Sequence, residues 1–223
     1  PGQTQTFKHI LLRNDGEFKF VEESKSKGIS GDGFGWGAIF TDTDLDGNLD
    51  LLFAENTFLY PKHHLLPNPG HYYKMDYSKS NPNGKFIREF KYRNKNFGQT
   101  PLDIDINNDN KKDIVWINME GPVIGYINNK LDSTNSNNYI VLMLPKNTDF
   151  INCNIVVDTG KTKIYRENIV GGIGFGSDNN DGSLMIGIGK SNKIKDIKIY
   201  LINGKEIIIK NPKINSILKP KII

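Results

Sequence analysis

Short apolar runs alternate with turn signals along the whole chain. The runs are rich in Ile, Val, Phe and Tyr, and most are too short and too β-branched to form helices. Only a turn around residues 21–26 is expected to be helical. Steps that combine Asn or Asp with Gly supply the positive φ of tight hairpins. These steps stand at residues 14–16, 81–84, 158–160, 180–182 and 203–204, and the pattern predicts an all-β protein.

A nine-residue pattern occurs twice in the first part of the chain. Asp42–Asp50 carries acidic residues at alternate positions, and the related stretch Asp105–Asp113 follows it by 63 residues. The correspondence extends upstream, because Phe34-Gly35 is matched by Phe97-Gly98 at the same spacing. Two repeats of this length therefore fill the chain to about residue 128.

A polar stretch, residues 132–138, follows the repeats. It offers no large apolar side chain to a core, which is typical of a domain boundary. We therefore expect repeats at residues 1–131 and a different strand-rich domain at residues 132–223.

The first copy of the pattern has the spacing of a cation-binding loop. Alternate side chains of a tight loop converge on one point, and Asp42, Asp44 and Asp46 are followed by a fourth carboxylate at Asp50. Carboxylates this close repel one another without a cation, and hard oxygen ligands in a flexible loop suit Ca²⁺ better than zinc. The alternative is a solvated acidic turn. No Lys or Arg lies within the loop to neutralise it, which favours calcium.

The surroundings of the loop exclude an EF-hand. Gly47 can adopt the positive φ of a sharp turn, and the carbonyl of Asn48 can add an oxygen ligand. An EF-hand would also need flanking helices and a Glu at the twelfth position, where this chain has Phe53 within the strand-like run 51–54. The loop is therefore expected between two strands.

At this point the residues resemble the FG-GAP (VCBS-type) repeat family, in which Phe-Gly precedes the metal loop and Asp-Leu follows it. The resemblance implies β-propeller-type blades, here an incomplete ring because two blades do not close one. It also implies calcium ligation in both copies. The implied ligands are Asp42, Asp44, Asp46, the Asn48 carbonyl and Asp50 in the first loop, and Asp105, Asn107, Asp109, the Lys111 carbonyl and Asp113 in the second. The second loop departs from the family pattern at Asn107 and Asn110.

The C-terminal segment is similar to the ASPIC/UnbV domain that often follows such repeats. The resemblance rests on residues 138–144, 167–175, 184–189 and 194–204. It implies a small domain of β-sandwich or barrel-like form. The usual Trp-Pro before the last hairpin is replaced by Leu201-Ile202. That family has no agreed catalytic residue, so the resemblance implies none here.

Composition excludes several classes of function. The net charge is +4, but the lysines gather near the C-terminus without arginines, which argues against nucleic acid as a partner. The single cysteine, Cys153, excludes an internal disulfide, and with four histidines it does not make the usual zinc cage. No apolar run approaches the roughly 20 residues of a membrane span.

These observations lead us to expect a non-catalytic, calcium-stabilised module for adhesion, assembly or ligand binding. Cytosolic calcium is too low for loops of moderate affinity, so we expect an extracellular or cell-surface location, with the periplasm also compatible. The partner would be a protein or glycan ligand at a surface, or copies of the chain itself.

Two other functions stay open. A polysaccharide-active enzyme is one, although we find no acid/base pair outside the metal loops and no Ser/His/Asp set at recognisable spacing. A lectin-like module is the other, with the His- and Tyr-rich stretch 60–73 as a recognition surface. The simpler interpretation of that stretch is a Pro-, His- and Tyr-rich connector.

Overall fold

The computed structural model describes residues 9–29, 34–56, 70–109, 112–129, 137–169 and 183–221. These residues form an almost entirely β protein, which confirms the all-β prediction. The helices among them are α1 (Ser24–Lys27), which overlaps the helical turn expected at 21–26, and the 3-10 helix η2 (Thr148–Phe150). Neither is long and apolar enough to cross a membrane.

The first repeat forms a four-stranded antiparallel sheet, and the second forms a three-stranded one. The strand order of the first sheet is β3-β4-β5-β6, and that of the second is β7-β8-β9. The strands are β3 (Phe34–Thr41), β4 (Asp50–Asn56), β5 (His71–Asp76), β6 (Lys85–Glu89), β7 (Phe97–Ile104), β8 (Asp113–Glu120) and β9 (Ile124–Tyr126).

The strand boundaries reproduce the repeat found in the sequence. β7 begins and ends 63 residues after β3, and β8 begins 63 residues after β4. Both hairpins also shift register at the same place, between Gly35 and Gly37 in the first and between Gly98 and Thr100 in the second. The two copies therefore share one backbone plan, with an acidic loop between the strands of each hairpin.

The two sheets pack on each other, because β7 lies along β3 and β4. Ile39 and Leu52 from the first sheet share this core with Ile114 and Trp116 from the second. Trp116 is fully buried, and its indole N–H donates a 2.8 Å hydrogen bond to the carbonyl of Tyr92. A buried indole thus keeps a polar partner.

The opposite face of the first sheet is covered by the N-terminal segment. Side chains alternate along β4, so that Leu51 and Phe53 point away from the second sheet and pack with Ile29 and Phe86. Since both faces of β4 are buried, its sequence is a continuous apolar run rather than an alternating one. The covering segment contains α1 and the hairpin of β1 (Leu12–Asn14) and β2 (Phe20–Glu22).

The C-terminal domain consists of two sheets around one core. In the described residues these sheets form a sandwich and not a closed barrel. Of the sandwich and the barrel-like form expected from the sequence, the structure therefore shows the sandwich. Their orders are β13-β10-β16 and β12-β11-β14-β15. The strands are β10 (Asn138–Met143), β11 (Asn154–Asp158), β12 (Lys163–Glu167), β13 (Ser183–Gly189), β14 (Asp196–Tyr200), β15 (Glu206–Lys210) and β16 (Ile217–Leu218).

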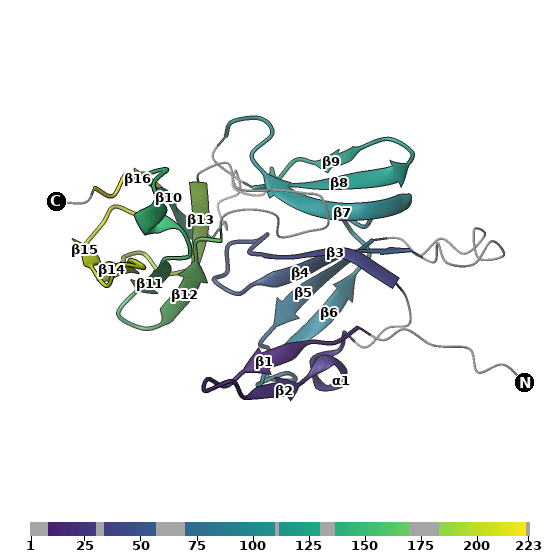
Figure 1. Cartoon of the computed structure of the whole chain (residues 1–223), viewed down its shortest axis with the longest axis horizontal. Coiled ribbons are helices and arrows are strands. Elements are labelled where there is room, and N and C mark those ends of the chain that lie inside the picture. The colour runs from purple at the N-terminus through teal and green to yellow at the C-terminus, as the bar shows by residue number, and fades with distance from the viewer. Residues whose placement is uncertain are drawn as a thin grey trace, which may run out of the picture.

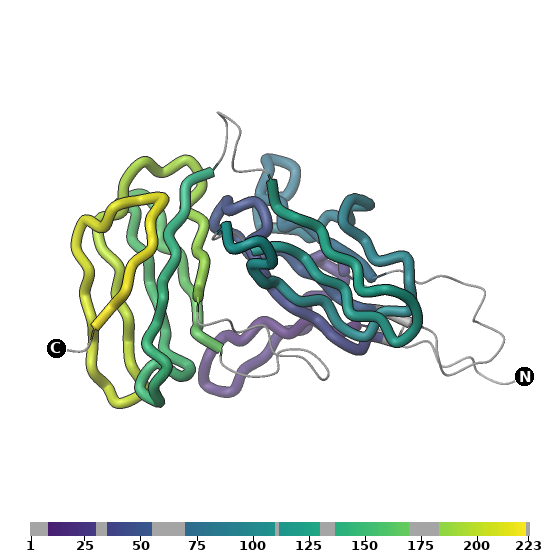
Figure 2. Tube along the Cα trace, turned by 90° about the horizontal axis from the view of Figure 1, so that it is seen from above, coloured from purple at the N-terminus to yellow at the C-terminus, as the bar shows by residue number. Residues whose placement is uncertain are grey.

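The domains lie beside each other, and the turn between β3 and β4 points toward the C-terminal sandwich (Figure 1). The view from above shows the same arrangement, with the sandwich at one end of the molecule (Figure 2). The domain boundary expected after residue 131 lies outside the described residues. The β3–β4 turn is the acidic loop of the first repeat, so the fold places that loop between the domains.

Candidate metal centre

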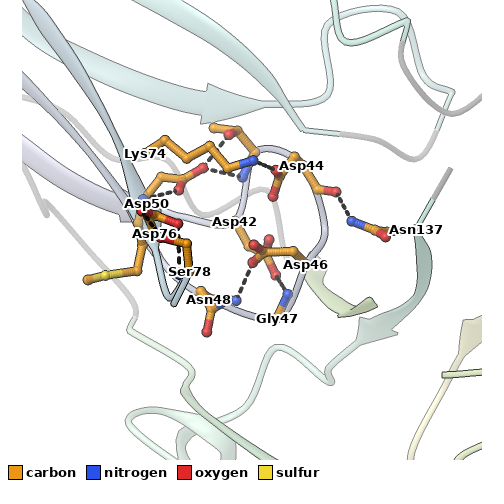
Figure 3. A network of polar contacts seen from close by, with 12 residues as sticks. Asp42, Asp44, Asp46, Gly47, Asn48, Asp50, Lys74, Asp76, Ser78 and Asn137 are labelled. Carbon is orange, nitrogen blue, oxygen red and sulfur yellow. Dashed lines mark hydrogen bonds and ion pairs between the residues drawn. The ribbon is translucent and has the colours of Figure 1, made fainter. Parts of the chain in front are cut away.

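The loop of the first repeat is folded by its own polar side chains. The backbone N–H of Gly47 donates to Asp42 Oδ2 at 3.1 Å, and that of Asn48 donates to Asp46 Oδ1 at 2.8 Å. Gly47 has φ +93°, which a glycine adopts without strain. These contacts turn the aspartates toward the inside of the loop (Figure 3).

Three of the expected ligands are brought together by this fold. Asp42, Asp44 and Asp46 each offer a carboxylate oxygen, and these oxygens lie within 4.8 Å of one another. One oxygen of Asp42 and one of Asp44, Oδ1 in both cases, are buried without a hydrogen-bond partner. A buried acceptor left without a donor is costly, so these two atoms are suited to ligate a cation.

The second oxygens of the same two carboxylates are held by cationic side chains. Asp42 Oδ2 accepts from Arg166 Nη2 at 3.1 Å, and Asp44 Oδ2 accepts from Lys74 Nζ. Arg166 lies on β12 and Lys74 on β5, so neither belongs to the loop. Each carboxylate therefore has one oxygen fixed from outside and one left toward the centre.

The pKa values of two loop aspartates are raised, because the crowded, buried site disfavours their charged forms. Burial raises the pKa of Asp42 to about 7, although Arg166 opposes the shift and the neighbouring carboxylates reinforce it. Burial also raises the pKa of Asp46. A divalent cation would stabilise the ionised forms of these groups and reverse both shifts.

The fourth aspartate, Asp50, lies outside the group of three. Its side chain is buried and accepts hydrogen bonds from Tyr72 Oη at 3.0 Å, the backbone N–H of Met75 at 2.9 Å, and the hydroxyl of Thr43. Burial raises its pKa to about 6. Asp50 thus ties the loop to β5.

The loop of the second repeat is more exposed. Its Asp113 is fully buried and accepts from the backbone N–H groups of Ile106 at 2.9 Å and Asn128 at 2.7 Å, as the counterpart of Asp50. Asp109 donates its backbone N–H to Asp105 Oδ1 at 3.0 Å and to Asn107 Oδ1 at 3.2 Å. Lys111 lies outside the described residues. Within the described part, this loop does not gather three carboxylates.

The first loop also contacts the C-terminal domain. The side chain of Leu45 is buried against Val141 and Met185, and its carbonyl accepts from Gly189 N at 3.0 Å. A cleft of about 440 Å³ runs along this junction, with Asp42 among its lining residues.

The His- and Tyr-rich stretch contributes buried side chains rather than an exposed recognition surface in its described part. His71, Tyr72 and Tyr73 begin β5 and are buried on both faces of the first sheet. They are therefore neither a connector nor a recognition surface, because strand pairing places them inside. Residues 60–69, with His63 and His64, lie outside the described residues.

Comparison with known proteins identifies the C-terminal part of the chain. Residues 144–221 match the family described as ASPIC and UnbV. The match begins directly after β10 and extends through β16, so it confirms the resemblance inferred for this domain. A search of curated proteins found no match to the chain.

Proposed function

We propose that this chain is a calcium-stabilised, non-catalytic β-module that acts in adhesion, assembly or ligand binding. In this proposal the two repeats are FG-GAP/VCBS-type blades of a propeller-like assembly, joined to an ASPIC/UnbV domain. The observation that carries the proposal is the pair of buried, unpartnered oxygens on Asp42 and Asp44 beside Asp46.

The donor set of the first loop fits calcium. Its candidate ligands are all oxygens, which hard divalent cations prefer, and the loop offers no soft or imidazole ligand. Asp42, Asp44 and Asp46 would hold the ion, with the Asn48 carbonyl and Asp50 completing the set. Asp50 can keep its hydrogen bond from Met75 while using a second lone pair on the metal. When bound, the ion supplies positive charge and no redox chemistry, so its role is structural.

The second loop is proposed as a weaker site built from Asp105, Asn107, Asp109, the Lys111 carbonyl and Asp113. Because both loops hold a hairpin closed, calcium binding would add directly to folding stability. Loops of this kind fill where calcium is abundant, which supports an extracellular, cell-surface or periplasmic location. The partner is proposed to be a protein or glycan at a surface, or another copy of the chain.

Calcium titration with thermal unfolding tests the proposal. We expect a calorimetric binding signal and a melting temperature that rises with Ca²⁺ and falls with EGTA. Asp44→Asn should lose most of this rise, because it removes one charge of the central group. Glu17→Gln, which removes a charge from an exposed hairpin, is the control and should keep it. Equal melting temperatures of the wild type in Ca²⁺ and EGTA would exclude a structural calcium site.

A lectin-like function is the second candidate, and a cluster at the end of β6 favours it. Phe90 is 67% exposed, and the guanidinium carbons of Arg88 and Arg93 lie 5.5 Å and 5.6 Å from its ring centroid. The turn that contains Phe90 and Arg93 is held by a hydrogen bond, since the hydroxyl of Tyr126 donates to the carbonyl of Arg93 at 2.9 Å. An exposed aromatic ring with two cations close to it suits an anionic sugar.

Binding to immobilised glycans separates the candidates. Retention on acidic glycans that is lost in Phe90→Ala, without shortening of the polymer, would support the lectin function. Depolymerisation would instead indicate an enzyme. Absence of both would leave the structural module as the function to pursue.

A further inference from the structure

Leu45 stands out among the residues of the acidic loop. It lies between Asp44 and Asp46, has φ +60°, and is 1% exposed. The left-handed region is unfavourable for leucine, whereas asparagine tolerates it. The second repeat has Asn108 at the same position with φ +58°, and that residue is exposed. The two loops therefore share the left-handed conformation at this position, and the first places a buried apolar side chain where the second has a solvent-facing polar one.

The C-terminal domain contacts the backbone of Leu45 at Gly187, where a larger residue would not fit. A Cβ atom on Gly187 would lie 2.3 Å from the carbonyl carbon of Leu45, so only glycine permits this approach. Two residues further along β13, Gly189 donates its N–H to the Leu45 carbonyl. The side chain itself packs on Val141 and Met185, which belong to β10 and β13. Backbone and side chain of Leu45 are thus both held by one sheet of the sandwich.

Polar groups of the C-terminal domain hold the same loop on either side of Leu45. The guanidinium of Arg166 donates to Asp42 Oδ2 and to the carbonyl of Gly47, both at 3.1 Å. The amide of Asn137 donates to the carbonyl of Asp44 at 2.9 Å. The loop conformation that docks on this domain is therefore the one that gathers the three carboxylates.

We propose that the loop of the first repeat is the docking surface for the C-terminal domain, and that cation binding and domain docking are coupled through it. This inference rests on the proposed function, since it takes Ca²⁺ to be the ion. Arg166 acts as a positioning residue, because it fixes Asp42 Oδ2 and leaves Oδ1 for the cation. Linkage is reciprocal: if docking favours the calcium-binding conformation, calcium must favour docking by the same factor. In the described part of the second loop, Asn108 stands in place of Leu45 and is exposed, so it offers no apolar side chain for such docking.

The rate at which a thiol reagent labels Cys153 reports on the C-terminal domain alone. Cys153 is the single cysteine of the chain, and it is fully buried in the core of the sandwich. Its labelling by a thiol reagent in mild denaturant therefore reports opening of that domain. At Ca²⁺ about a hundred times its dissociation constant, we expect labelling to be at least about tenfold slower than in EGTA; mass action sets a ceiling of about a hundredfold.

Two variants should remove this effect by different routes. Leu45→Asn puts the residue of the second repeat into the first loop, which removes the apolar contact and keeps every ligand. Gly187→Ala acts from the other domain and changes no charge. In both, calcium should slow labelling less than twofold, and calcium affinity should fall. Gly204→Ala is the control, because Gly204 lies in the same domain and a Cβ there meets no atom within 4 Å, while its φ of +82° makes alanine strained and the domain less stable. It should label faster overall and keep the calcium effect.

The outcomes distinguish the two proposals. If the wild type binds Ca²⁺ and Cys153 labels equally fast with and without it, the domains are not coupled, and calcium binding stands. If both Leu45→Asn and Gly187→Ala keep the wild-type calcium effect, the docking surface is wrongly placed. If calorimetry shows that the wild type binds no Ca²⁺, the proposed function fails and the coupling with it.

Discussion

The backbone N–H of Gly189 donates a 3.0 Å hydrogen bond to the carbonyl of Leu45, and this contact joins the C-terminal sandwich to the acidic loop of the first repeat. Leu45 is flanked on both sides by candidate metal ligands. One short stretch of backbone therefore belongs to the metal centre and to the domain interface at once. A change at the metal centre should therefore alter the domain interface, and a change at the interface should alter the metal centre.

The two loops should differ in calcium affinity. The first has four aspartates and no basic residue over nine positions, whereas the second has three aspartates and two lysines. Ligand charge is a principal control of calcium affinity, so the first loop should bind more tightly. In calorimetric titrations Asp46→Ala should remove the tighter phase and Asp109→Ala the weaker one. The reverse assignment would refute the charge argument.

Asp50 should matter for stability even without calcium. Asp50→Ala would leave the N–H of Met75 without its acceptor, and the hydroxyls of Tyr72 and Thr43 would keep only their contact with each other, at a cost of about 2–4 kcal/mol in EGTA. Tyr72→Phe removes only one donor and should cost about 1 kcal/mol. Urea unfolding of the two single variants and the double variant measures the coupling between the pair. Additive effects would mean that the hydrogen bond between them contributes nothing.

Lys74 should compete with calcium for Asp44. Its ammonium group pairs with Asp44 Oδ2, and its side chain is 38% exposed, so it contributes mainly charge. In Lys74→Met we expect lower stability in EGTA, because Asp44 loses its counter-ion, together with tighter calcium binding. The calcium-induced rise in melting temperature should therefore exceed that of the wild type. Lys19→Met, on an exposed hairpin, should match the wild type, and weaker calcium binding in Lys74→Met would contradict this role.

Cys153 should make the stability of the chain fall at alkaline pH. Burial raises the pKa of its thiol to about 11. The folded state then keeps the proton at pH values where the unfolded thiol, with a pKa near 8.5, has lost it. The contribution of this thiol to the free energy of unfolding is complete below about pH 8.5 and declines as the pH rises toward 11. The difference between wild type and Cys153→Ala in urea midpoints from pH 8 to 11 isolates this contribution; a constant difference would mean that the thiol does not titrate as expected.

Much of the local architecture could be predicted from the sequence. The 63-residue spacing located β7 and β8 from β3 and β4, because each repeat carries its own turn residues and strand pattern. The alternate spacing of Asp42, Asp44 and Asp46 indicated that their carboxylates converge, and the structure brings these three together. These features depend only on nearby residues, because a tight loop with a glycine at its turn sets the directions of its own side chains.

The surroundings of the metal centre were decided by the tertiary structure. The sequence around the loop contains no cation, yet folding places Lys74 and Arg166 on its carboxylates from distant strands. The stretch around His71 suggested a connector or an exposed surface, whereas pairing with β4 places His71 in a strand and buries it.

The same distinction holds for Leu45. By itself the sequence determined the strands, the repeat and the acidic loop, because these depend on backbone preferences and spacing within a few residues. Only the fold decided that a leucine in a turn would be buried, since its burial depends on Gly187, which approaches from far along the chain. Long-range packing of that kind leaves no periodic mark in a single sequence, and it is what joins the metal centre to the second domain.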